Sequence, residues 1–597
     1  MKKYQKRTMV LGMTGILLLT GCGGKADGAA GTAPWTEGLP ATETETAPWT
    51  KQLPETDSGA AEDAASVVEA PSEAADMAED STLGAASRTE SASNKKESKT
   101  EDADIRDLPE KLYAKGDVPD GYLGSCYEFD EETGSRDNLE EYSKWEEQGF
   151  FSVMAQPQST FSADVDTASY SNLRRLIREG YDLESLPEGA VRIEDMLNYF
   201  SYDYEEPAGQ EPFGVTTQIG RCPWNEEAEL LMIGLKTEDI SYEQAPASNL
   251  VFLLDVSGSM GEPDKLPLLQ ESFLQLTENL TEKDRISIVT YASEDRVILE
   301  GADGSEKRKI KKAVNGLKAG GGTWGSRGIE TAYALAEENL IEGGNNRIIL
   351  ATDGDLNVGM TTEEELEELI SEKKESGILL SVLGFGTGNI KDNKMETLAD
   401  KGNGNYAYID CMQEAKKVLS EEMTATLLTV CKDVKLQIEF NPELVEAYRL
   451  LGYDNRVLDR EDFHDDTKDG GEIGAGHSVT ALYEIILREP LHHGMTSREI
   501  EDLKYGSEYK KRVDETSAAA QKYKEWLTVS IRYKKPAGNK SELLEYPIGY
   551  DSYCENPSDD FQFAAAVAEF GLLASHSEYP GGASLENVTR TVKKLDL

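Results

Sequence analysis

Short aliphatic runs alternate with helical patterns through the middle of the chain. Runs rich in Val, Ile and Leu predict strands at 250–254, 286–291, 348–351 and 379–385. Between and after them, apolar residues recur at helical spacing and predict helices at 264–280, 305–317, 326–339, 362–375, 391–400 and 411–429. Alternation of this kind is typical of a parallel sheet with helices on both faces. We therefore predict an α/β domain with a doubly wound parallel sheet over residues 247–430.

The pattern on either side of this domain is different, because strands follow one another there without helices. Residues 230–235 form an apolar run before the domain, and strand patterns return after it at 434–440, 444–451, 479–487 and 526–533. Since β-rich stretches lie on both sides of the α/β unit, we predict that 212–246 and 431–535 pair into one sandwich from which the α/β domain emerges.

Helical patterns mark the outer parts of the ordered chain. Residues 166–180 begin with a candidate N-cap, Asp166, and end at a glycine, and a second helical pattern covers 191–200. Residues 557–574 have the pattern of one capped, well-buried helix. We predict an N-terminal helical region over 106–211 and a C-terminal helical region over 536–597.

The first 22 residues resemble a bacterial lipoprotein signal peptide. A basic start precedes an apolar run at 9–19, which is shorter than the roughly 20 residues that a transmembrane helix needs. Leu19-Thr-Gly-Cys22 follows, similar to a lipobox, whose cysteine becomes the lipid-modified N-terminus. Burial of two acyl chains on Cys22 would anchor the chain to a membrane without spanning it. We therefore expect an extracytoplasmic protein, lipid-anchored to a bacterial cell membrane.

The next segment, 23–105, has few residues that could form a core. It is rich in Ala, Ser, Thr, Glu and Pro and contains no Phe or Tyr. Such a composition cannot bury enough apolar surface to offset the entropy of ordering. We predict a disordered stalk that holds the folded part away from the membrane.

Charge narrows the range of partners. The formal net charge is −51, so the chain repels nucleic acid and attracts divalent cations. Five cysteines follow Cys22, an odd number from which no complete disulfide framework can be predicted. This number is compatible with mostly unpaired thiols and also with one or two disulfide bridges.

The candidate chemistry lies where strands of the α/β domain end. Asp255, Ser257 and Ser259 form the motif DVSGS directly after the first aliphatic strand. Thr323 follows three glycines, and Asp353 stands just after a second buried strand. In open α/β sheets, ligands bind outside the carboxyl ends of the strands. Because these residues supply only oxygen ligands, the set suits a hard cation such as Mg²⁺.

This set resembles the metal-ion-dependent adhesion site of von Willebrand factor type A domains. The resemblance implies that Ser257, Ser259 and Thr323 are hydroxyl ligands of Mg²⁺ or Mn²⁺, and that Asp255 and Asp353 act largely through water. It also implies a coordination position left open for an acidic group of a protein partner.

The flanking segments carry a second resemblance. Four blocks are similar to those around the type A domain in bacterial YfbK-like lipoproteins, and they begin at Ser159 (STFSADVDTASY), Val191 (VRIEDMLNYF), Gly471 (GEIGAGHSVTALYE) and Ser558 (SDDFQFAAAVA). This resemblance covers residues 157–575 and does not itself imply an activity.

Asp164, Asp166 and Ser169 look like a degenerate copy of the metal motif, although helix capping by Asp166 explains part of it. A second cation site there is the less favoured interpretation.

The chain has no GxSxG elbow, HExxH motif or phosphate-binding loop. We therefore predict no catalytic residues and expect a membrane-anchored binding or scaffold protein. The alternative is a cell-envelope enzyme that uses the type A domain to recruit its substrate.

Overall fold

The computed structural model describes residues 139–209, 211–322, 325–354, 363–374, 376–422, 425, 427–488, 525–536, 538 and 540–595. The predicted signal peptide, Cys22, the predicted stalk and Thr323 lie outside these residues. Within the described part of the chain, no helix has both the length and the apolar character needed to cross a membrane.

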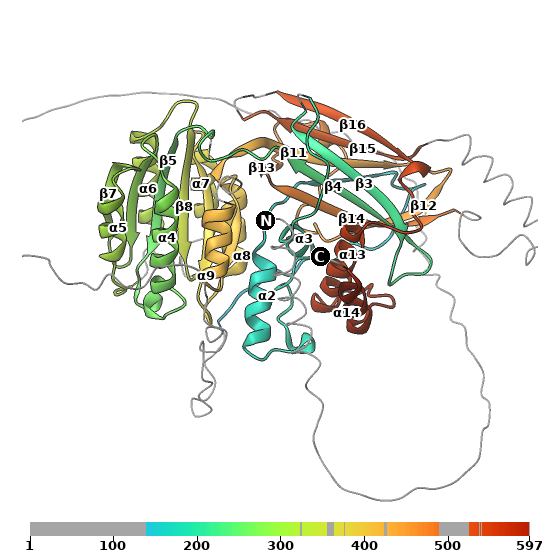
Figure 1. Ribbon diagram of the computed structural model, residues 1–597, viewed down its shortest axis with the longest axis horizontal. Coiled ribbons are helices and arrows are strands. Elements are labelled where there is room, and N and C mark those ends of the chain that lie inside the picture. The colour runs from blue at the N-terminus through green and yellow to red at the C-terminus, as the bar shows by residue number, and fades with distance from the viewer. Residues whose placement is uncertain are drawn as a thin grey trace, which may run out of the picture. The chain divides into compact units, whose positions relative to one another are not determined.

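The middle of the chain folds into a six-stranded sheet with helices on both faces (Figure 1). Its strands, in spatial order, are β10(Tyr406–Ile409), β9(Leu379–Phe385), β8(Asn345–Thr352), β5(Ser248–Asp255), β6(Arg285–Tyr291) and β7(Asp295–Asp303). Neighbouring strands are parallel except β7, which runs antiparallel to β6. The doubly wound sheet is therefore confirmed, but its edge strand β7 departs from the predicted all-parallel arrangement.

Alternation along the central strand shows why helices are needed on both faces. Leu250, Phe252 and Leu254 of β5 belong to one core cluster, whereas Val251 and Leu253 belong to another. Successive side chains of a strand point to opposite faces, so a strand that is apolar at every position must be covered twice. The first cluster includes side chains of α4(Leu266–Asn279), α5(Lys307–Asn315) and α9(Met412–Lys416); the second includes those of α6(Gly325–Glu338), α7(Glu363–Lys374) and α8(Asp392–Lys401).

Strands from both sides of the α/β domain build a two-sheet sandwich. The first sheet has the order β1(Phe151–Ser152), β12(Val445–Leu451), β14(Ser478–Leu487), β4(Glu229–Thr237) and β3(Phe213–Arg221). The second has the order β13(Gly471–Gly474), β11(Thr429–Phe440), β15(Glu525–Lys534) and β16(Ser541–Gly549), with β2(Gln158–Ser162) paired to β11. Because β4 precedes the α/β domain and its partner β14 follows it, the predicted sandwich is confirmed.

A helical layer covers the outer face of the first sheet. It is formed by α2(Ala168–Arg178), α3(Ile193–Asn198), α13(Asp559–Ala574) and α14(Leu585–Lys594). Leu231 and Ile233 of β4 face the sandwich core, and Leu230 and Met232 pack with this layer. The short helices η1(Leu183–Ser185), η2(Gly258–Gly261), η4(Asp462–His464) and η5(Tyr550–Ser552) and a π-helical turn, η3(Lys417–Glu421), complete the described elements.

Several local features differ from the sequence prediction. The N-cap of α2 is Thr167, and the Asp166 carboxylate instead accepts a hydrogen bond from the backbone N–H of Tyr406 at 2.7 Å. Tertiary contact has therefore replaced local capping. Strand β16 lies in the segment 536–597, and β1 and β2 lie in 106–211, although helices were expected in both. Cys222, Cys411, Cys431 and Cys554 are free thiols.

Candidate functional site

Two aspartates meet where neighbouring central strands end. Asp255 is the last residue of β5, and Asp353 directly follows β8, which runs parallel to β5 with Leu254 opposite Ala351. Both carboxylates are buried. Thr352 connects the two strand ends, because its Oγ1 donates a hydrogen bond to Asp255 Oδ2 at 3.2 Å.

The DVSGS loop brings two hydroxyls beside these carboxylates. The backbone N–H of Ser257 donates to Asp255 Oδ1 at 2.8 Å, so the aspartate itself shapes the turn. The hydroxyl oxygens of Ser257 and Ser259 lie 2.9 Å apart. Ser257 is buried and Ser259 is exposed, so the group extends from the interior to the solvent.

A glycine-rich loop lies against the DVSGS loop. The N–H of Gly258 donates to the carbonyl of Gly321 at 3.0 Å, and the N–H of Gly320 donates to the carbonyl of Val256 at 2.9 Å. These bonds hold the segment leading to Thr323 next to the two serines. Thr323 itself lies outside the described residues, so its role as a ligand stays a prediction. We call Asp255, Ser257, Ser259 and Asp353 the adhesion site.

Lys265 is a functional residue that sequence reasoning missed. Its Nζ lies 2.9 Å from Asp353 Oδ2, and both side chains are buried. The aliphatic stem of Lys265 passes over Gly386, which has φ +77° and where a Cβ would clash with that stem. The available signal was a lysine ten residues after Asp255, at the start of a predicted helix. Nothing in the local sequence links this lysine to Asp353, because the two residues are far apart in the chain.

The electrostatics of the site favour a bound cation. Burial, and after it the nearby charge of Asp353, raise the pKa of Asp255 to about 7, although hydrogen bonds from Ser257 and Thr352 act in the opposite direction. A carboxyl whose ionised form is destabilised by burial and by a like charge gains most from a positive ion beside it.

An orphaned oxygen tests whether the residues fit a metal. Lys265 donates to Asp353 Oδ2, but Asp353 Oδ1 is buried and has no hydrogen-bond partner within the described part of the chain. Buried polar atoms are rarely left unsatisfied, so this oxygen is the one available to a cation or its water. Two carboxylates and two hydroxyls form an all-oxygen set, which fits a hard divalent cation. The described residues of the adhesion site therefore fit a divalent metal ion.

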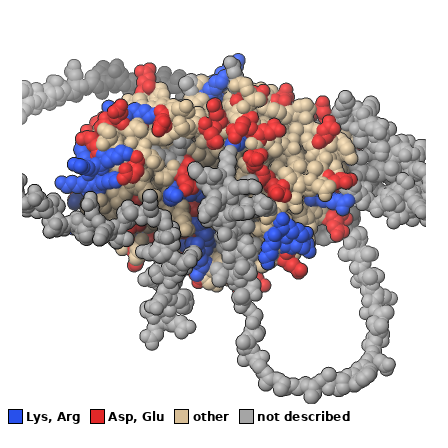
Figure 2. All heavy atoms as spheres, viewed as in Figure 1, with Lys and Arg blue, Asp and Glu red and all other residues tan. Residues whose placement is uncertain are grey.

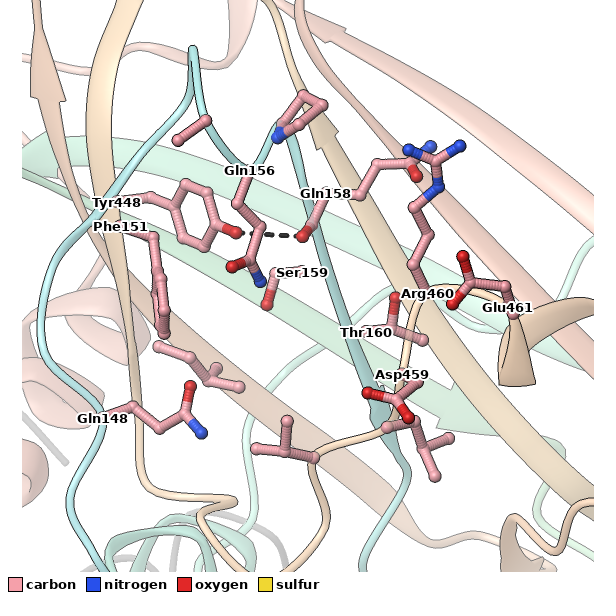
Figure 3. Close-up of a pocket in the computed structure, with 15 residues that line it drawn as sticks. Gln148, Phe151, Gln156, Gln158, Ser159, Thr160, Tyr448, Asp459, Arg460 and Glu461 are labelled. Atoms are coloured by element: carbon pink, nitrogen blue, oxygen red, sulfur yellow. Dashed lines mark hydrogen bonds between the residues drawn. The ribbon is translucent and has the colours of Figure 1, made fainter. Parts of the chain in front are cut away.

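A separate pocket of about 300 Å³ lies in the sandwich, beside β1, β2 and β12 (Figure 3). Tyr448 lies in its wall and donates a hydrogen bond to the carbonyl of Gln158 at 2.9 Å. The hydroxyl of Ser159 accepts a bond from Tyr483 at 3.0 Å. None of the residues that line this pocket is a His or Cys, so they offer no nucleophile–base pair of the usual kind.

Comparison with protein-family models divides the chain into three matched segments. The model described as von Willebrand factor type A domain matches residues 249–421, and one described as von Willebrand factor matches 136–232. A third, described as "Uncharacterized protein YfbK, C-terminal", matches 425–596.

Curated proteins give matches of very different extent. The chain is 42% identical to protein YfbK of Escherichia coli over 454 residues, which cover 75% of this chain and 76% of YfbK. It is 31% identical to human inter-alpha-trypsin inhibitor heavy chain H4 over 146 residues, which cover 23% of this chain and 16% of that protein.

Among solved structures, von Willebrand factor type A from Catenulispora acidiphila covers 64% of this chain and 89% of its own, with 15% identity and a TM-score of 0.36. Proximal thread matrix protein 1 of the mussel byssus, with a zinc-occupied MIDAS motif, covers 32% of this chain and 46% of its own at 20% identity and a TM-score of 0.26.

The sequence match to YfbK, 42% identity over three quarters of both sequences, shows the family. The chain belongs to the YfbK family of proteins that contain a von Willebrand factor type A domain.

Proposed function

We propose that this protein is a binding protein whose type A domain holds Mg²⁺ or Mn²⁺ at the adhesion site and thereby engages an acidic group of a protein partner. The observation that carries the proposal is the buried Asp353 Oδ1, for which the described residues provide no hydrogen-bond partner, beside Asp255 and the paired serine hydroxyls. Type A domains are protein-interaction modules, and this chain contains one at 249–421.

Surface charge explains why a metal would be needed. The chain has a net charge of −51, and Figure 2 shows patches of acidic side chains across the visible face, with basic ones gathered near α5 and near α14. An acidic partner is repelled by such a surface at long range. When bound, a divalent cation supplies a local positive charge that can accept a carboxylate oxygen of the partner.

The chain's own residues perform the other tasks. Asp255 holds the DVSGS turn through the N–H of Ser257, and Thr352 fixes the other oxygen of Asp255. Lys265 fixes one oxygen of Asp353 and leaves the other available. Ser259, which is exposed, marks the side from which a partner can approach.

The metal-binding step can be tested by calorimetric titration of Mg²⁺ into the wild type and Asp255→Ala. We expect binding heat from the wild type and its loss in the variant. Asp303→Ala is the matched control, because it removes a carboxylate of the same domain from the edge strand β7. Equal heats from wild type and Asp255→Ala would contradict the proposal.

The binding step needs a partner-capture experiment. Immobilised wild-type protein should retain a cell-envelope protein in Mg²⁺ and release it in chelator, and Asp255→Ala should not retain it. Asp303→Ala should behave as wild type. Capture that survives both the chelator and Asp255→Ala would exclude the adhesion site as the binding surface.

We also propose that a lipid on Cys22 anchors the chain outside the cytoplasm, on the basis of the lipobox-like Leu19-Thr-Gly-Cys22. Cys22→Ser should release the protein to the soluble fraction or leave the signal uncleaved. A processed, unmodified N-terminus found by mass spectrometry of the wild type would contradict this proposal.

A further inference from the structure

Three acidic side chains meet inside the protein at a place that shares no residue with the adhesion site. Asp164 follows β2, and Glu194 and Asp195 lie in the first turn of α3. One carboxylate oxygen of each lies within 4.8 Å of the others, and the three residues are 5%, 2% and 0% exposed. We call them the buried carboxylate cluster.

The surroundings of the cluster contain many more acids than bases. Arg192 pairs with Asp195 at 3.0 Å, Asp392 at 2.6 Å and Glu396 at 3.0 Å. Arg456 pairs with Asp400 at 2.6 Å and lies 3.4 Å from Asp164 and 3.5 Å from Asp166. These two guanidinium groups therefore pair with six carboxyl groups, and Glu194 brings the buried acids of this group to seven: Asp164, Asp166, Glu194, Asp195, Asp392, Glu396 and Asp400.

If all seven are ionised, this group keeps an excess of five negative charges. Buried charges are ordinarily paired or bound to metal, because removal from water is costly. Among the ion pairs of the described residues, neither guanidinium pairs with Glu194. Either bound protons or a cation must therefore lower the charge.

The position of each cluster member is constrained by its neighbours. Asp195 Oδ2 accepts hydrogen bonds from the N–H and the hydroxyl of Ser169, at 3.1 and 2.9 Å. Glu194 packs against Gly452, which has φ +73° and where a Cβ would clash with the Glu194 carboxylate. A glycine is required there both for the backbone angle and for the close approach of this carboxylate.

Asp164 supplies the independent sign of a missing ligand. Its Oδ1 accepts a hydrogen bond from the N–H of Asp166 at 3.0 Å. Its Oδ2 is buried and has no hydrogen-bond partner among the residues that the structure describes. Because Asp164 is only 5% exposed, a cation beside this oxygen would supply the partner that the described residues do not.

We propose that Asp164, Glu194 and Asp195 form a second, structural binding site for a divalent cation, with Ca²⁺ the preferred ion. Ca²⁺ binds oxygen at about 2.4 Å, so two of its ligands can be at most about 4.8 Å apart, as the three oxygens here are. Mg²⁺ binds at about 2.1 Å and keeps several waters, which suits a buried cluster less well.

The site would connect elements that are distant in sequence. The cluster joins the segment after β2 to α3. Arg192 then links α3 to the type A domain, because it forms ion pairs with Asp195 of α3 and with Asp392 and Glu396 of α8. A bound cation would offset the repulsion among these acids and so stabilise the contact between the type A domain and the flanking helices.

Metal content per chain distinguishes this site from the adhesion site. Full-length protein is stripped with chelator, dialysed against Ca²⁺ and Mg²⁺ together, and analysed for both metals by mass spectrometry. We expect about two ions per wild-type chain and about one in Asp255→Ala. Glu194→Gln should retain the Mg²⁺ and lose the Ca²⁺.

The matched control is Glu569→Gln, which changes a buried glutamate of α13 away from the cluster and should retain both ions. Loss of Ca²⁺ in Glu194→Gln alone supports the proposal. Retention of both ions by Glu194→Gln would overturn it. So would a wild type without bound Ca²⁺, because protons would then be the charge that balances the cluster.

A second measurement applies even if Glu194→Gln fails to fold. In the Asp255→Ala background, in which the adhesion site is disabled, Ca²⁺ should raise Tm by several degrees over chelator, because a ligand that binds only the folded state stabilises it. An unchanged Tm would overturn the proposal. Failure of Mg²⁺ binding at the adhesion site would leave this result unaffected, so the two proposals are tested separately.

Discussion

The adhesion site and the buried carboxylate cluster both place acidic side chains close together, but in different surroundings. Each has a carboxylate oxygen to which no described residue donates a hydrogen bond, Asp353 Oδ1 in the first and Asp164 Oδ2 in the second. The adhesion site lies at the carboxyl edge of a sheet, reaches solvent at Ser259, and has a lysine on one of its two aspartates. The cluster is buried, and two arginines are shared among many acids.

This difference indicates different tasks. A site with an exposed rim can exchange its ion and present it to a partner, whereas an ion enclosed by three buried carboxylates can only stabilise the fold. The charge balance also differs: with all carboxylates ionised, Lys265 leaves the adhesion site with one excess negative charge, whereas the cluster and its neighbours keep five.

Replacing Arg192 should have the largest effect. Arg192→Met removes the partner of Asp195, Asp392 and Glu396 and leaves buried carboxylates without it. Breaking a buried pair costs about 3–5 kcal/mol, and we expect a loss near 5 kcal/mol in the free energy of unfolding, measured by denaturant titration. Arg178→Met is the control: its side chain is 52% exposed, so the loss should stay below about 1 kcal/mol. Similar losses of unfolding free energy in both variants would show that the buried Arg192 contributes no more to stability than the exposed Arg178.

Replacing Lys265 should cost less, and the cost should depend on metal. Lys265→Met leaves Asp353 without its ion pair, so we expect the free energy of unfolding in chelator to fall by about 3 kcal/mol. Mg²⁺ should restore part of this loss, because a bound cation compensates the same carboxylates. The gain in Tm on adding Mg²⁺ should therefore be larger in the variant than in the wild type. An equal gain in both proteins would show that Lys265 and the metal do not act on the same charge.

The pH dependence of the metal-free protein should report the adhesion site. Burial and the charge of Asp353 raise the pKa of Asp255 to about 7, above its value in an unfolded chain. The folded state then binds the proton more tightly, so this contribution to stability is present at low pH and is lost as pH rises toward 7. One proton gives a slope of at most about 1.4 kcal/mol per pH unit.

Thermal unfolding in chelator between pH 4 and 8 measures this slope for the wild type and for Asp255→Asn. The variant should have the shallower slope, since its amide does not titrate. Identical slopes would show that Asp255 does not titrate in this range.

The smallest effect should come from Thr352, whose hydroxyl binds Asp255 Oδ2. Thr352→Val keeps the shape but removes the donor to Asp255 and the acceptor of the Gly354 N–H, so it should lower stability by about 1–2 kcal/mol and weaken Mg²⁺ binding severalfold. Calorimetric titration of Mg²⁺ into this variant and into Asp255→Ala compares the two losses of binding. A loss of Mg²⁺ binding as complete as that in Asp255→Ala would mean that Thr352 has a larger part in the site than one hydrogen bond.

Local patterns alone were enough to predict much of this protein. The alternation of aliphatic strands with helices predicted the doubly wound sheet, because strands covered on both faces are apolar at nearly every position, as β5 is. The placement of Asp255 and Asp353 also followed from sequence, since parallel strands bring their carboxyl ends to the same edge. The hydrophobic pattern likewise predicted α13 with its Ser558 cap.

Tertiary structure decided the features that depend on residues far apart in the chain. Lys265 reaches Asp353 past Gly386, the residue after β9, which leaves room for the lysine stem because it has no Cβ. Asp166 does not cap α2, because the backbone of β10 offers its carboxylate a buried donor. The sequence groups Asp164 with Asp166 and Ser169, and the structure keeps both beside the cluster, because Asp166 donates to Asp164 and Ser169 donates to Asp195. Only the tertiary structure adds Glu194 and Asp195, which come from α3. Charge balance in a buried group depends on every element that packs there, so no local pattern could have predicted it.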